Sequence, residues 1–135
     1  MESFRIFFSA DTHGNTVVWR KWLSAVQVYK ADVLIFAGDL TGKAIVPVFD
    51  YGDHYEAEVL GQKRKAKTKE ELQKLLDFIE GLSYYYIVAT PEEIQEIAAD
   101  PKKQAELFER LMKERMKKWL DLIIEKLNLN EVLPI

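Results

Sequence analysis

The first forty residues contain two short apolar runs separated by an amphipathic segment. Residues 4–9 and 32–37 are almost continuously apolar, which predicts two strands that are buried on both faces. Between them, apolar side chains recur at helical spacing over 17–29, with Asn15 or Thr16 as the N-cap. This order predicts a βαβ unit with parallel strands. The predicted fold class is therefore α/β.

The pattern changes after residue 43. Two strand-like runs flank the turn-forming residues 50–53, which predicts a hairpin in which Pro47 favours an edge strand. Residues 62–69 are strongly basic, which predicts a solvated loop leading into a helix that Thr68 caps. A strand over 84–88 and two helices, each with a cap residue followed by proline, complete the series, and the last helix ends near residue 127.

These elements predict a single domain, 1–135, in three parts. A βαβ core covers 1–43, an insertion made of a hairpin and helices covers 44–128, and the beginning of a strand covers 129–135. Because the last strand has hardly begun, we expect the chain to be the N-terminal part of a larger protein.

The composition narrows the classes of function. The 19 basic and 22 acidic residues give a net charge of −3, so a surface built for nucleic acid is not expected. The absence of cysteine excludes disulfides, thiolate nucleophiles and sulfur-ligated zinc. No apolar run is long enough for a membrane span and no signal peptide is recognisable, which predicts a cytoplasmic protein. The abundance of Lys and Glu is typical of heat-adapted proteins.

Candidate metal ligands follow both predicted strands. Asp11 and His13 come after the first strand and Asp39 after the second. Neighbouring parallel strands end at the same edge of a sheet, so these side chains should converge. Residues two apart in an extended segment also point the same way, which favours joint binding by Asp11 and His13. Mixed oxygen and nitrogen ligands favour Mn, Fe, Ni, Co or Zn over Ca and Mg.

Three further residues are candidates for binding a substrate phosphate. Gly14 permits a sharp turn and close approach to the N-terminus of the following helix, where Asn15 also lies and an anion is favoured. Lys43 could reach the phosphate. The structural alternatives are that the aspartates only cap helices, that Lys43 is an ordinary surface lysine and that His54 is an exposed hairpin residue rather than a ligand.

Two segments carry a resemblance to a known family. "SADTHGN" and "VLIFAGDLTGK" resemble the first two motifs of the calcineurin-like metallophosphoesterases, Asp-x-His and Gly-Asp, each after a hydrophobic strand. The resemblance implies half of that family's β-sandwich, hydrolysis of a phosphate-ester substrate and a dinuclear metal site. In such a site Asp11 and His13 would bind the first ion and Asp39 would bridge both.

The later motifs of the family are absent. The family continues with an Asn-His pair, a further His and a Gly-His-x-His, whereas the only histidine after residue 39 is His54. The resemblance thus covers about the first 45 residues and implies an enzyme without the second half of its active site, of weak or no activity, and with no catalytic residue assigned. The alternative is a non-catalytic metal-binding or self-assembling module, a homodimer formed through an unfinished sheet edge.

Overall fold

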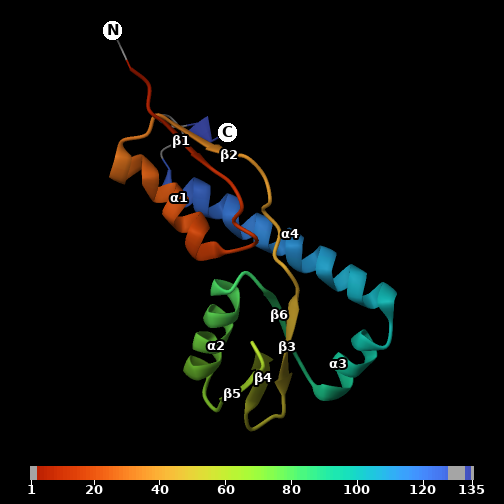
Figure 1. Ribbon diagram of the computed structural model, residues 1–135. Helices are drawn as coiled ribbons and strands as arrows, with labels where there is room; N and C mark the ends of the chain where they lie inside the picture. Colours follow the sequence, from red (N-terminus) through yellow and green to blue (C-terminus); the bar gives the residue numbers. More distant parts are fainter. Residues whose placement is uncertain (1–2, 128–132, 135) are drawn as a thin grey trace.

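The computed structural model describes residues 3–127 and 133–134, and within them it is a mixed α/β protein with two sheets (Figure 1). The elements follow in the order β1 (Ile6–Ser9), α1 (Thr16–Tyr29), β2 (Val33–Phe36), β3 (Ile45–Asp50), β4 (Tyr55–Val59), β5 (Gln62–Ala66), α2 (Lys69–Gly81), β6 (Tyr85–Ala89), α3 (Pro91–Ala98), α4 (Pro101–Lys126) and β7 (Leu133–Pro134). The predicted α/β class is confirmed.

The N-terminal sheet has the strand order β1-β2-β7 and is parallel throughout. Ile6 pairs with Val33 and Ser9 with Phe36, so the predicted βαβ unit is present. β7 agrees with the strand expected near the end of the chain, while the other residues of 129–135 lie outside the described part. Helices α1 and α4 pack on one face of this sheet around Leu34, which is fully buried.

The mixed sheet has the order β5-β4-β3-β6. β3 and β4 form the predicted hairpin, and β6 joins β3 in parallel. The prediction that Pro47 lies on an edge strand is wrong, because β3 lies between β4 and β6. Pro47 is tolerated there because the pairing of β3 with β4 starts only at Val48, one residue later. Helix α2 covers one face of this sheet and forms a second core with it.

The basic run is mostly a strand and not the predicted loop. Its residues 62–66 form β5 at the edge of the mixed sheet, where Lys63 lies opposite Glu58 and Lys65 opposite Glu56. Opposite charges directly across a strand pair stabilise it, and lysines on an edge strand discourage further pairing. The sequence pattern missed this strand because its apolar partner surface is supplied by other elements: Arg64 packs over the ring of Phe78 at 4.0 Å.

Helix α4 joins the two sheets (Figure 1). Its Trp119 is buried and stacks on Trp19 of α1 with ring centroids 4.7 Å apart. The indole of Trp119 donates to Thr16 Oγ1 at 3.0 Å, and the indole of Trp19 donates to the carbonyl of Trp119. The α1–α4 contact is therefore fixed by hydrogen bonds as well as by packing.

Among the described residues, no helix is both long and apolar enough to traverse a lipid bilayer.

Candidate metal centre

The loops after β1 and β2 are hydrogen-bonded to each other along their length. The bonds run from the amide of Ala37 to Ser9, of Asp11 to Gly38, of His13 to Asp39 and of Gly14 to Leu40, at 2.8 to 3.1 Å. They extend the pairing of the two parallel strands beyond the strand ends. The first loop is thereby held alongside the second.

The structure brings Asp11, His13 and Asp39 together. One ligand atom from each residue lies within 4.8 Å of the others, and Nδ1 of His13 is 3.3 Å from Oδ1 of Asp39. Two neighbouring ligands of one cation, each about 2.1 Å from it, are about 3.0–3.5 Å apart, and opposite ligands about 4.2 Å. The three groups therefore fit one cation after a small side-chain rotation.

The three candidate ligands share an uncommon backbone conformation. Asp11, His13 and Asp39 have φ angles of 59°, 47° and 53°, in the left-handed region. The expectation that an extended segment aligns Asp11 and His13 is therefore wrong, because left-handed turns bring them together. Asp and His are among the residues that tolerate this conformation best, and such strain is concentrated at functional sites.

A buried hydroxyl group lies within the same loop. Thr12, between two candidate ligands, is 2% exposed, and its Oγ1 has no hydrogen-bond partner in the described part of the chain. An unpaired buried hydroxyl costs about 1–3 kcal/mol. Together with the three left-handed residues, it indicates that this loop is not optimised for stability alone.

The site is open to solvent. The side chains of His13 and Asp39 are 42% and 49% exposed, and Asp11 is exposed. A cation can therefore reach the three side chains directly from solvent.

The three residues expected near a phosphate are placed differently from one another. Gly14 is buried and its amide is bonded to Leu40, while a Cβ at this position would lie 2.7 Å from the Cα of Gly42. Asn15 is the N-cap of α1, as predicted, and its side chain accepts hydrogen bonds from the amides of Val17 and Val18. The same side chain donates to the carbonyl of Gly81 at 2.8 Å. Only the ammonium group of Lys43 is exposed and available to an anion.

A buried ionic network lies beneath the loop that carries Asp11 and His13. Arg115 is 7% exposed and donates to the carbonyl of Gly14, while its Nε is 3.7 Å from Oε1 of Glu80. Glu80 also accepts from Thr16 and, at 3.1 Å, from Lys118. Burial raises the pKa of Glu80, but these hydrogen bonds and positive charges outweigh it, so the pKa lies below its ordinary value.

Sequence reasoning missed this network, although a signal exists. Leu111, Arg115 and Trp119 follow at intervals of four, so a charge interrupts the apolar stripe of a helix. Such a residue is expected to need a buried partner of opposite charge.

His54 lies in the hairpin, as predicted, but it is not exposed. Its side chain is 19% exposed and stacks on Tyr51, with ring centroids 5.0 Å apart. Both ring nitrogens are occupied, Nδ1 by Asp53 at 2.6 Å and Nε2 by Glu56 at 3.1 Å. The hydrogen bond to His54 is the main cause that lowers the pKa of Asp53.

Comparisons with known proteins add no relative: no family model matches the chain, and no curated protein or solved structure is significantly similar to it.

Proposed function

We propose that this protein is a metal-dependent phosphoesterase of the calcineurin-like type, with Asp11, His13 and Asp39 as ligands of a divalent cation. The observation that carries the proposal is the convergence of these three groups within 4.8 Å, from two loops that follow adjacent parallel strands. The sequence motifs that resemble the family occupy the same two loops.

The donor set is suited to a transition metal. Two carboxylates and one imidazole leave coordination positions open for water and substrate, as in catalytic metal sites. When bound, a divalent cation supplies charge neutralisation at the phosphoryl oxygens and lowers the pKa of a coordinated water.

The chain's own residues hold and orient the reactants. Asp11 and Asp39 contribute two negative charges that attract a cation, and His13 contributes a nitrogen on the same side. Lys43 follows the second loop and contributes an exposed positive charge toward which an anionic phosphate is attracted.

The three ligand side chains are enough for one metal ion but not for two, which limits the expected rate of hydrolysis. Within the described residues, no other group of three or more His, Asp or Glu side chains converges in this way. A second tightly bound ion is therefore not expected, and turnover should be slow.

Hydrolysis of p-nitrophenyl phosphate with added Mn²⁺ tests the proposal. We expect slow, metal-dependent turnover that is abolished in Asp39→Asn and kept in Asp53→Asn, a matched change beside the other histidine. Turnover that is equal in both variants, or its absence with Mn²⁺, Co²⁺, Ni²⁺ and Zn²⁺, contradicts the proposal.

A second candidate function, a self-assembling module, is favoured by one observation. Phe4, just before β1, and Ile6 and Phe8 within it are 76%, 61% and 64% exposed. Parallel sheets are usually covered on both faces, so a second copy is a suitable cover. Light scattering tests it: a dimer that Phe8→Lys dissociates supports this function, and a monomer at all concentrations contradicts it.

A further inference from the structure

The two faces of the mixed sheet are covered unequally. Val46 and Val48 face α2 and are buried in the second core. The alternate residues Ile45 and Pro47 face α3 and α4 and are only half-buried, and α3 has no fully buried residue. A groove of about 620 Å³ is left on this side.

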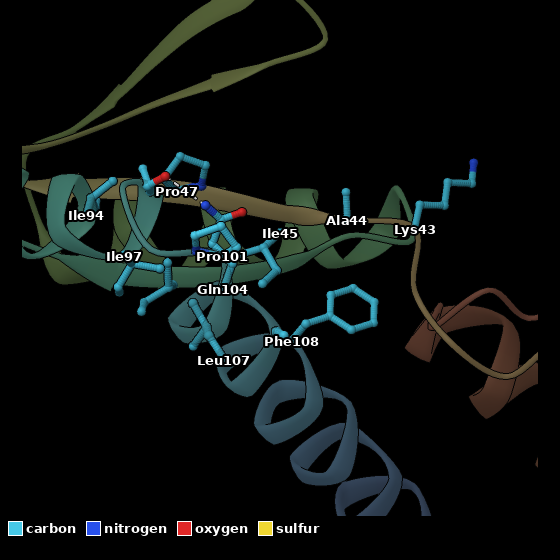
Figure 2. A pocket seen from close by; sticks show the side chains of 13 residues that line it. Lys43, Ala44, Ile45, Pro47, Ile94, Ile97, Pro101, Gln104, Leu107 and Phe108 are labelled. Atoms are coloured by element: carbon cyan, nitrogen blue, oxygen red, sulfur yellow. Dashed lines mark hydrogen bonds between the residues drawn. The ribbon is translucent and has the colours of Figure 1, made fainter.

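The groove is almost entirely apolar. Its walls are aliphatic side chains such as Ile87, Ile94 and Ile97, together with Phe108, and Gln104 is the one uncharged polar side chain among the lining residues. Figure 2 shows side chains such as Ile45, Ile97 and Phe108 along the groove, with Lys43 at one end and its side chain directed away from them into solvent. Lys43 makes no ion pair with the described residues, so its charge is available to a ligand.

The charged end of the groove is also the end that adjoins the loops of Asp11, His13 and Asp39. Lys43 follows Gly42, and a Cβ on Gly14 would lie 2.7 Å from the Cα of Gly42. Gly14 in turn follows His13. Asp39 precedes Lys43 by four residues, which span at most about 14 Å.

We propose that the groove binds the hydrocarbon part of a phosphate monoester, with its phosphate near Lys43 and the metal centre. This inference rests on the proposed function and names its substrate class: esters of apolar alkyl or aryl alcohols. The volume is within the range of about 300–1,000 Å³ typical of small-molecule sites. A sugar or nucleoside is disfavoured, since its hydroxyl groups would find one polar lining side chain and lose hydrogen bonds to water.

Methyl NMR of isoleucine-labelled protein tests the groove directly. Hexyl phosphate, added to the Zn²⁺-loaded protein, should shift the methyl signals of Ile45, Ile87, Ile94 and Ile97 and leave those of Ile79 and Ile123, which belong to the two cores. Methyl phosphate should leave the groove signals unchanged. Hexyl phosphate should bind at least about tenfold more tightly than methyl phosphate, because each buried methylene adds affinity.

A groove-filling variant provides the matched comparison. Ala105 lines the groove and is exposed, so Ala105→Trp should weaken hexyl phosphate binding about tenfold or more without unfolding the protein. Ala99→Trp, an exposed position outside the lining residues, should leave the affinity unchanged.

Two results would overturn the inference: groove methyl signals that do not respond to hexyl phosphate, or equal affinities for the hexyl and methyl esters. Binding of Zn²⁺ alone, measured by calorimetry without any ester, reports separately on the proposed function. If Zn²⁺ binds and the groove does not respond, only the substrate class is wrong. If neither Zn²⁺ nor Mn²⁺ binds, the proposed function itself fails.

Discussion

The two histidines of the described structure each lie beside two carboxylates, but they differ in how many of their ring nitrogens are bonded and in how exposed they are. Both ring nitrogens of His54 are occupied by acidic side chains of its own hairpin, and only 19% of its side chain is exposed. His13 faces Asp39 through Nδ1, is 42% exposed and belongs to a group that converges from two separate loops. Both ring nitrogens of His54 already have partners, whereas His13 lies open to solvent among carboxylates, which is an arrangement suited to a cation.

The backbone under the two histidines differs as well. His54 lies in a hairpin whose only positive φ angle between residues 50 and 55 is at Gly52. His13 and its two partners all have positive φ angles, and Arg115 and Gly42 support their loop from beneath. The site of Asp11, His13 and Asp39 therefore depends on packing against segments distant in sequence, whereas the site of His54 depends on its sequence neighbours. Substitutions at the two sites test this difference.

Loss of Arg115 should have the largest effect on stability. Arg115→Met removes the donor to Gly14 and leaves Glu80 buried with fewer positive partners. Breaking a buried ion pair in this way costs about 3–5 kcal/mol. We expect that decrease in the free energy of urea unfolding. Arg110→Met, which removes an arginine that is 62% exposed, should change it by less than about 0.5 kcal/mol. Equal effects would show that the network does not support the loop.

Alanine substitutions at Gly14 and Gly61 distinguish the cost of steric contact from the cost of backbone strain. Gly14 and Gly61 have nearly equal φ angles, 75° and 73°, but only at Gly14 would a Cβ meet backbone, 2.7 Å from the Cα of Gly42. Gly61→Ala should cost about 1 kcal/mol from left-handed strain alone. Gly14→Ala should cost about 2–4 kcal/mol, because the two loops must also separate, and should weaken Mn²⁺ binding. Equal losses in urea unfolding would contradict the close packing of the loops.

Glu80 makes the stability of the folded protein depend on pH. Because the pKa of Glu80 is lower in the folded protein than its ordinary value of 4.5, the ionised form stabilises the fold above that pH. This stabilisation is lost as the pH falls through the lower pKa of the folded state. Glu80→Gln should therefore be less stable than the wild type at pH 7, by about 1–3 kcal/mol, and should lose less stability on acidification below pH 4.5. Parallel pH profiles would exclude a role for this carboxylate.

The smallest effect is expected at the hairpin. His54→Asn removes the hydrogen bonds that its two ring nitrogens make with Asp53 and Glu56, carboxylates whose side chains are 85% and 35% exposed. Exposed pairs contribute little, so the loss of stability should be below about 1 kcal/mol. Mn²⁺ affinity, measured by calorimetry, should be unchanged. A loss of metal affinity in this variant would remove the distinction between the two histidines.

Much of the N-terminal sheet and of the candidate site could be predicted from the sequence. Apolar runs and helical spacing identify β1, α1 and β2, and parallel topology alone requires Asp11, His13 and Asp39 to meet at one edge. The route by which they meet could not be predicted, because left-handed conformations at Asp and His leave no pattern in the sequence. Gly14 was recognised as a turn residue, but its contact with Gly42 arises only when both loops are in place.

In the rest of the chain, features that depend on residues close in sequence could be predicted, whereas features that depend on residues distant in sequence could not. The caps at Thr90 and Asp100 are set within one turn of helix and were found. β5 was missed because its stability comes from glutamates across the hairpin and from a ring on α2. The Arg115–Glu80 pair was missed because its members are 35 positions apart on helices whose relative placement depends on the whole fold.

Calorimetric titration of the metal-free protein with Mn²⁺ tests whether Asp11, His13 and Asp39 bind a cation. We predict one binding event per chain, which His13→Asn weakens at least about a hundredfold and His54→Asn leaves intact. Absence of Mn²⁺ binding to the wild type, or binding that survives in His13→Asn, would contradict the account.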